Sequence, residues 1–305
     1  MAKLTQNKIL VPVDFSEQSL IALGQSYNFA REYNAELLLL YIMEDVGWMR
    51  ATTKQIKDMK ASIQKKLDKL AAETSKKNQI VVDTMLAKGK VYEKIIEVAD
   101  MVNATMIIMG CNSRKKIEKF FIGSNALRVV RQSTCPVITI KGKHHREGCK
   151  NIVLPLDLTK ETRDKVKKAI EVAKLGSFKA TIHAVSVLQS SDEFLVNKIT
   201  AQMNLVKSDI QSQGVECTAE IIMKQKGDLP LTKYIINYAK KVKGDLLIIM
   251  TQQEANFTRM FIGSTAQEMV NNSDIPVMSI IPKVRKYRLE GESSAAMKGL
   301  LTVPL

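Results

Sequence analysis

Cysteine is scarce in this sequence, and long hydrophobic runs are missing from it. The four cysteines are scattered, and none forms the C-x-x-C pair of a zinc ribbon or a thioredoxin-like site; they are Cys111, Cys135, Cys149 and Cys217. No apolar run approaches the roughly 18–20 residues that span a membrane, and the first residues do not resemble a secretory signal. We therefore expect a cytoplasmic protein with free thiols and no membrane partner.

Aromatic and acidic residues are also few. Phe, Trp and Tyr make up 5% of the chain, and 31 Asp and Glu compare with 46 Lys and Arg, which gives a formal net charge of +15. A basic balance favours acidic partners such as nucleotides or nucleic acid. The lysines, however, are spread over many helix faces, and no alternation of basic and aromatic residues suits the stacking of single-stranded bases. Solvated helix surfaces explain the charge, and nucleic acid is not an expected partner.

The chain contains an internal repeat of three sequence blocks. The first block recurs after 143 residues and the other two after 140. They are residues 9–16 with 152–159, 121–126 with 261–266, and 135–140 with 275–280. A period this long indicates a duplicated domain rather than a solenoid of short repeats.

Two domains and a tail follow from the repeat. We predict a first domain at residues 1–142, a second at 149–283 and a tail at 284–305. The segment between the domains is polar and flanked by glycines, as domain junctions often are. It holds His144 and His145, but adjacent histidines do not face one way and no Cys or acid at ligand spacing supports them. We interpret them as solvated linker rather than as a metal site.

Each copy alternates short apolar runs with amphipathic segments. The runs predict buried parallel strands at residues 8–13, 36–43, 80–86, 105–109 and 136–141, and at 151–156, 179–187, 215–223, 245–250 and 276–281. Helical spacing predicts the helices between them, including a long one with a core-facing stripe at Ile56, Met59, Ile63, Leu67 and Leu70. Alternating strands and helices predict an α/β fold, doubly wound, with helices on both faces of each sheet.

Three segments of the first copy should meet at the carboxyl ends of its strands, where ligands bind in such sheets. They are Pro12-Val13-Asp14, the segment from Met109 to Ser113, and Gly123-Ser124-Asn125. The last opens a helix, whose free N–H groups favour an anion, and residues 114–119 before it are rich in cations. These features suit a polyphosphate. The alternative is that Gly110 and Gly123 only make turns and that Ser124 only caps its helix.

These segments resemble the universal stress protein family over nearly the whole chain. The family's first strand ends in Pro-x-Asp, as at Pro12-Val13-Asp14, and a glycine after its third strand is matched by Gly89. Its ATP-binding members carry G-x2-G-x9-G-[ST] after the fourth strand. Here Gly110 and Gly123-Ser124 match that motif, and Ser113 stands in place of the second glycine.

The resemblance implies a fold and a ligand. The fold would be a five-stranded parallel sheet of order 3-2-1-4-5 in each copy. Members of the family commonly dimerise through the last strand, so that the two copies would pair within the chain. Whether the chain also forms a homo-oligomer is left open. The ligand would be ATP in the first copy, with or without Mg²⁺. Asp14 would contact ribose or adenine, Val13 and Ile42 would line the adenine slot, and phosphates and ribose would lie on Gly110, Ser113, Gly123, Ser124 and Asn125. Pro12, Gly89 and Met109 complete the expected binding residues.

The second copy departs from the motif, and no catalytic set is recognisable in either copy. Its fourth strand runs into Thr251-Gln252-Gln253-Glu254 without a glycine, although Asp157 and Gly263-Ser264-Thr265 remain. We expect a structural partner domain that has lost or changed its ligand. No Walker A lysine motif and no S-G-G-x-D-S follow the first strand, and no general base stands beside the phosphate site. Three functions stay open: a stress or signalling module that binds ATP without ordinary turnover, a slow ATPase, and a ligand-free scaffold.

Overall fold

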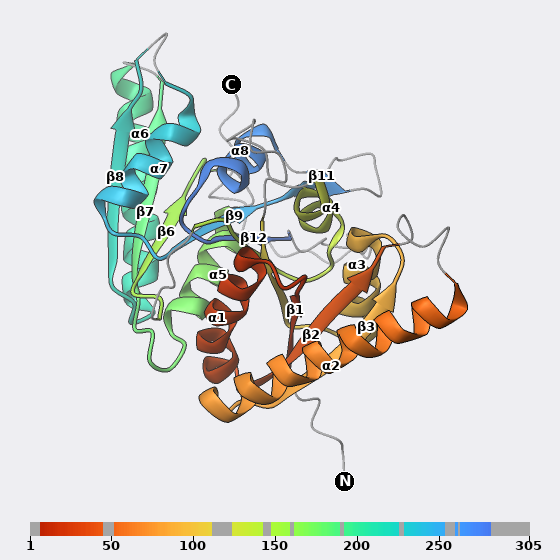
Figure 1. Cartoon of the computed structure of the whole chain (residues 1–305). Helices are drawn as coiled ribbons and strands as arrows, with labels where there is room; N and C mark the ends of the chain where they lie inside the picture. The colour runs from red at the N-terminus through yellow and green to blue at the C-terminus, as the bar shows by residue number, and fades with distance from the viewer. Residues whose placement is uncertain are drawn as a thin grey trace, which may run out of the picture.

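The structure, a computed structural model, describes residues 7–44, 52–111, 124–142, 148–158, 162–189, 192–225, 229–253, 260–261 and 263–281 (Figure 1). The predicted tail at 284–305 and the linker histidines His144 and His145 lie outside these residues. So do the cation-rich segment 114–119 and two residues of the predicted nucleotide site, Ser113 and Gly123.

The first half alternates strands and helices as its sequence pattern predicts. Its strands are β1 (Asn7–Pro12), β2 (Ala35–Met43), β3 (Val82–Lys88), β4 (Met106–Gly110) and β5 (Val137–Ile140). Its helices are α1 (Glu17–Glu32), α2 (Thr53–Asn78), α3 (Val91–Met101) and α4 (Ser124–Gln132). α1 begins after the N-cap Ser16, whose hydroxyl accepts a hydrogen bond from the Ser19 N–H.

The second half repeats this order. Its strands are β6 (Asn151–Pro155), β7 (Thr181–Leu188), β8 (Cys217–Met223), β9 (Leu246–Met250) and β12 (Val277–Ile280). Its helices are α5 (Thr162–Ala173), α6 (Glu193–Ser212), α7 (Leu231–Lys241) and α8 (Ser264–Asn272). A short antiparallel pair, β10 (Gln252–Gln253) with β11 (Met260–Phe261), follows β9 and was not predicted, because two-residue strands leave no periodicity.

The ten main strands form one continuous sheet of order β3-β2-β1-β4-β5-β12-β9-β6-β7-β8. Each half is therefore a parallel sheet of order 3-2-1-4-5, which confirms the predicted fold class. The halves join where β5 and β12 pair antiparallel, with Thr139 opposite Val277 and Val137 opposite Ser279. This pairing uses the last strand of each half, so that neither of these strands is left at an edge.

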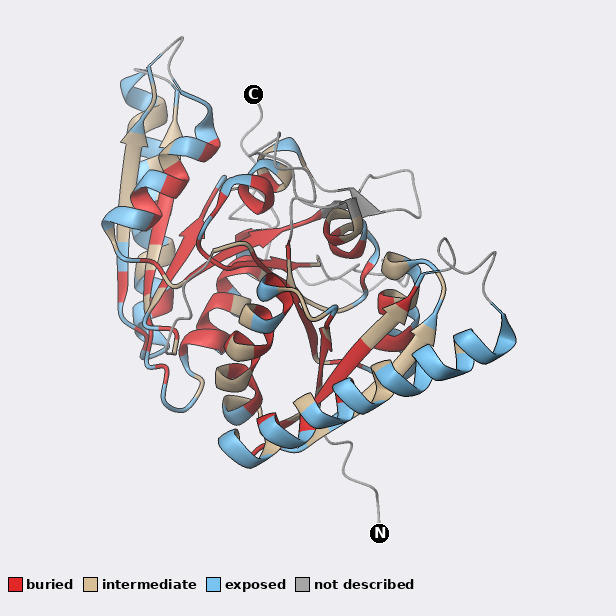
Figure 2. Ribbon diagram, in the orientation of Figure 1, coloured by how far each residue is buried: buried red, intermediate tan, exposed pale blue. Residues whose placement is uncertain are grey.

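Two hydrophobic cores cover the two faces of the sheet, and each extends across both halves (Figure 2). Alternate residues of β1 enter different cores, since Ile9 and Val11 face α1 and α2 whereas Leu10 faces α3 and α4. In the second half, α5 and α6 continue the first core, and α7 and α8 continue the second. All three of these β1 side chains are fully buried, as expected for a sheet covered on both faces.

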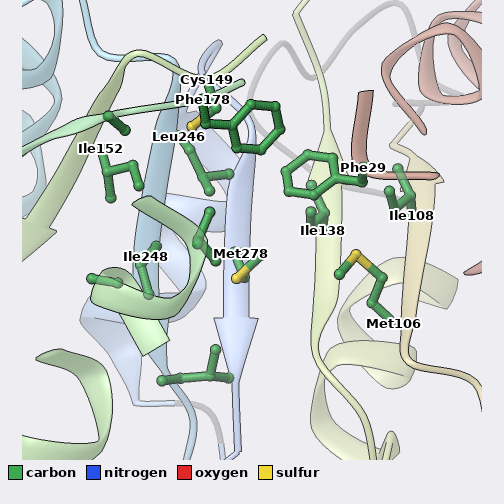
Figure 3. Close-up of a cluster of buried hydrophobic side chains, with 14 of the residues drawn as sticks. Phe29, Met106, Ile108, Ile138, Cys149, Ile152, Phe178, Leu246, Ile248 and Met278 are labelled. Carbon is green, nitrogen blue, oxygen red and sulfur yellow. The ribbon is translucent and has the colours of Figure 1, made fainter. Parts of the chain in front are cut away.

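The first core also carries a side-chain contact between the halves. Phe29 of α1 meets Phe178, which follows α5, edge to face with ring centroids 5.5 Å apart (Figure 3). Beside them, the Glu32 carboxylate accepts hydrogen bonds from the N–H and the hydroxyl of Ser177. A Cβ atom at Gly176 would lie 2.4 Å from Oε2 of Glu32, so that a larger residue there would displace this carboxylate from Ser177. Aromatic burial and charge-assisted hydrogen bonds together fix α1 against the second half.

Candidate functional site

A cavity of about 580 Å³ opens in the first half at the carboxyl ends of β1, β2 and β4. The strand order reverses between β1 and β4, which is where open α/β sheets bind ligands. The turn from β1 into α1 forms one wall, and the ends of β2 and β4 form the floor. Side chains from α2, α3 and the start of α4 complete the wall.

Most of the residues predicted from the sequence lie on this cavity. Its lining includes Pro12, Val13, Asp14, Ile42, Met109, Gly110 and Asn125. Ser124 is the first residue of α4, but its side chain lies outside the described residues, as do Ser113 and Gly123. The fold thus brings together segments about a hundred residues apart in sequence, and their roles in binding stay predictions.

Asp14 is held by the turn that leads from β1 into α1. Its Oδ1 accepts a hydrogen bond of 3.0 Å from the Ser16 N–H, and its own N–H donates to the Ser19 hydroxyl at 3.3 Å. Burial alone would raise the pKa of Asp14, but hydrogen bonds from Ser16 and Ser19 lower that pKa below its ordinary value. The carboxylate is therefore ionised at neutral pH and can accept further hydrogen bonds.

The residue after this aspartate has a left-handed backbone in both halves. Phe15 has φ of 61° and Leu158, after Asp157, has φ of 57°. Non-glycine residues rarely adopt this region, and such strain is retained where the surrounding structure fixes it. In the first half, the Phe15 ring lies against Tyr41 of β2 with centroids 5.4 Å apart, and Tyr41 lines the cavity. The turn is thus built to direct Asp14 to the cavity wall.

The last residue of β4 is a glycine, Gly110, and α1 packs closely against it. A Cβ atom there would lie 2.4 Å from the backbone oxygen of Gln18 and 3.0 Å from the N of Ser19. The segment that follows β4 lies outside the described residues, and the φ of Gly110 is not positive, so that glycine's backbone freedom does not account for this residue. Packing of α1 accounts for the glycine, which nevertheless lies on the cavity floor.

Gly89 follows β3, as the sequence predicted, but it is not among the residues that line the cavity, and its role in binding stays a prediction. It has φ of 140°, and its N–H donates a hydrogen bond of 3.0 Å to the Met43 carbonyl. This bond ties the turn after β3 to the end of β2, where Met43 and Glu44 line the cavity. Gly89 is therefore a turn residue that positions the cavity wall.

The sequence missed the contribution of α2 and α3. Met59 and Ile63 belong to the stripe predicted to face the core, but both line the cavity, and Met59 is 47% exposed. The later part of α2 reaches the core, at Leu67 and Ala71. Helical periodicity shows which residues share a face, but it cannot show that a helix extends past the end of its sheet.

The charges on the cavity are asymmetric. The described lining contains two carboxylates, Asp14 and Glu44, and no Lys or Arg. Arg128 of α4 makes a cation–π contact instead, with its guanidinium over the Tyr92 ring at 4.7 Å from the centroid. An anionic ligand would therefore place its charge at the amino end of α4 rather than beside the two carboxylates.

Comparison with known proteins shows the family of this chain. The model of the universal stress protein family matches residues 6–141 and again 148–280. The chain belongs to the universal stress protein family. Universal stress protein MJ0531 of Methanocaldococcus jannaschii is 29% identical over 142 residues, which are 44% of this chain and 81% of that protein. Universal stress protein YxiE of Bacillus subtilis is 25% identical over 146 residues, 44% of this chain and 99% of its own.

A solved structure of similar extent shares the fold of this universal stress protein. The crystal structure of a universal stress protein from Archaeoglobus fulgidus is similar with a TM-score of 0.75 at 20% sequence identity, and the match covers 91% of this chain and 99% of that chain. The likeness shows the fold. Among the described residues, no helix is long and apolar enough to cross a membrane. The same residues contain no group of three His, Cys, Asp or Glu that could hold a metal ion.

The second half of this universal stress protein keeps a cavity at the equivalent place. It has a volume of about 500 Å³ and is bordered by Asp157, the end of β9 and the start of α8 with Gly263-Ser264-Thr265. Met250 occupies the strand position of Gly110, since each pairs with the last residue of the neighbouring strand. Loss of the glycine has therefore not closed the cavity, although it has changed its lining.

Proposed function

We propose that the first half of this chain binds an adenine nucleotide, ATP with or without Mg²⁺, as a stress-response or signalling module with little or no turnover. The observation that carries the proposal is an ionised aspartate at the mouth of an apolar slot. Asp14 stands at that mouth, and the slot is lined by Val13, Ile42 and Met109. An adenosine needs both features, because its base has an apolar face and its ribose and amino groups donate hydrogen bonds.

The phosphates would lie at the amino end of α4. That helix begins at Ser124, and Asn125 lines the cavity there. Its first N–H groups have no partner within the helix, and the helix dipole favours negative charge at this end. The carboxylates of Asp14 and Glu44 would repel phosphates, unless a Mg²⁺ ion lies between the phosphates and these carboxylates. The cation-rich segment 114–119 precedes α4 in the sequence and supplies a further source of positive charge.

Weak turnover follows from the acid–base groups on the cavity. A general base works best when its pKa lies near the operating pH, whereas hydrogen bonds hold the pKa of Asp14 below its ordinary value. No histidine belongs to the described lining. Bound ATP would then act by stabilising one conformation of the chain.

The two halves would work as a pseudo-dimer inside one chain. Their pairing through β5 and β12 occupies the strand edge that family members commonly use to dimerise. Gln18, in the first turn of α1 beside the cavity, donates hydrogen bonds to the carbonyls of Ile140 and Gly142 at the end of β5. α1 therefore borders the cavity and also contacts β5, the strand through which the first half pairs with the second. All four cysteines are free thiols, which suits a reducing compartment such as the cytoplasm.

Thermal unfolding with and without Mg-ATP tests this proposal. At about 100 times its dissociation constant, ATP should add roughly 2.7 kcal/mol to the free energy of unfolding. Asp14→Ala should weaken affinity by about ten- to a hundredfold, the usual effect of losing a charged hydrogen-bond acceptor, and the shift should shrink accordingly.

Asp157→Ala is the matched control, since it removes the equivalent aspartate from the second half. The stabilisation that ATP gives this variant should equal the stabilisation that it gives the unaltered chain. Phosphate release should stay at the level of a protein-free blank. Absence of any shift with ATP, ADP or AMP would instead favour a ligand-free scaffold.

A further inference from the structure

Three of the matched positions at which the two halves differ change the chemistry of the second cavity. Ala22 of α1 is replaced by Lys165 of α5, and Tyr41 of β2 is replaced by Ser186 of β7. Met250 replaces Gly110, as described above. The second cavity has therefore gained a cation and an aliphatic side chain while losing an aromatic one.

Lys165 is the charged group at the base of this cavity. Only 10% of its side chain is exposed, and its Nζ donates to the Pro155 carbonyl at 3.1 Å. The carboxylate of Asp157 lies 3.5 Å from Nζ, beyond the usual length of an ammonium–carboxylate hydrogen bond, and its side chain is 51% exposed. Burying an ammonium group is costly unless it is paired, and the contact with Asp157 is the longer of its two hydrogen bonds.

The rest of the lining is mainly aliphatic. Side chains from β7, α6, α7 and β9 surround the space, among them Val187, Ile199, Leu231, Ile235 and Ile249. Leu231 is partly exposed at 37% and lies at the amino end of α7. Such a surface can bury a hydrocarbon group.

Positive potential at one side of the cavity adds to that of Lys165. α8 begins after Gly263, which makes no side-chain cap, and its first turn has no acidic residue. Ser264 and Thr265 line the cavity at this point. Unlike the described lining of the first cavity, which holds two carboxylates and no Lys or Arg, this lining pairs its single carboxylate, Asp157, with a buried cation.

We propose that the second cavity binds an aliphatic carboxylate, with its head group on Lys165 and the amino end of α8 and its hydrocarbon chain among the aliphatic side chains. The carboxylate would replace the long contact of Lys165 with Asp157 by a shorter charge-assisted bond. Asp157 would turn to solvent, where half of its side chain already lies. The two halves would then bind different ligands, a nucleotide and an organic acid.

Methyl NMR of the full chain titrated with octanoate tests this proposal with a readout for each site. Met250 and Met269 line the second cavity, whereas Met43, Met59 and Met109 line the first. Octanoate should shift the methyl signals of Met250 and Met269 saturably and leave those of the first cavity in place. Octanol, which has the same chain without charge, should bind at least about tenfold more weakly.

Two variants identify the anchor. Lys165→Ala, which restores the residue found at Ala22, should weaken octanoate binding about tenfold or more, and exposed Lys167→Ala on the same helix should not change it. Asp157→Asn should tighten binding, because it removes the competing carboxylate. Equal affinity in Lys165→Ala, shifts confined to the first-cavity methionines, or no saturable shift would each overturn the proposal.

Discussion

Phe178→Ala should lower the free energy of unfolding by about 3–5 kcal/mol, the usual cost of removing a buried aromatic ring from a core. Phe178 is 3% exposed, and its ring contacts Phe29 edge to face across the seam between the halves. The loss includes the aromatic pair as well as the apolar area, and it leaves a void that the fixed Glu32–Ser177 contact hinders from collapsing. Chemical denaturation monitored by circular dichroism measures the change.

Phe194→Ala is the control for this experiment. Phe194 is 77% exposed on α6, so that its removal should change the free energy of unfolding by less than about 0.5 kcal/mol. Phe178→Ala should also make unfolding of the chain less cooperative, because part of the core beside the β5–β12 pairing would be lost. A Phe178→Ala chain as stable as Phe194→Ala would show that the halves do not depend on this contact.

Gly110→Val should destabilise the first half by about 1–3 kcal/mol or more and also abolish nucleotide binding. The added Cβ atom would lie 2.4 Å from the Gln18 carbonyl oxygen, which belongs to the backbone and cannot rotate away. α1 would have to move, and with it Ser16 and Ser19, which hold Asp14. Denaturation curves and ATP titrations of the same preparation measure both effects.

Met250→Val provides the matched substitution in the second half. It places valine at the equivalent strand position, where a side chain is already accommodated, and should cost less than about 1.5 kcal/mol. ATP binding should be retained in that variant. If Gly110→Val were as stable as Met250→Val and still bound ATP, α1 would not be packed on β4 as closely as the structure shows.

Much of the fold could be predicted from the sequence because its signals are local. Each of the ten main strands lies within two residues of the predicted range, since a buried parallel strand is a short apolar run bounded by polar turns. The order 3-2-1-4-5 came from the family resemblance and is confirmed in both halves. The join of β5 with β12 was also expected only from the resemblance, because pairing between the two halves leaves no periodicity in the sequence.

The site was predicted less completely, for physical reasons that differ between residues. Pro12, Asp14 and Asn125 lie on the cavity because the ends of parallel strands meet at one edge of the sheet. Gly89 lies in a turn beside the cavity lining, and the motif does not distinguish a residue that shapes the cavity from one that lines it. Lys165 looked like an ordinary helix lysine, and only the packing of α5 shows it buried beside Asp157.

Calorimetric titration of the full chain with ATP tests the central claim most directly, because it counts sites as well as detecting them. The account predicts one nucleotide per chain, at least about tenfold weaker binding in Asp14→Ala, and unchanged binding in Asp157→Ala. Two equivalent nucleotides per chain, or binding that depends on Asp157 and is indifferent to Asp14, would contradict it.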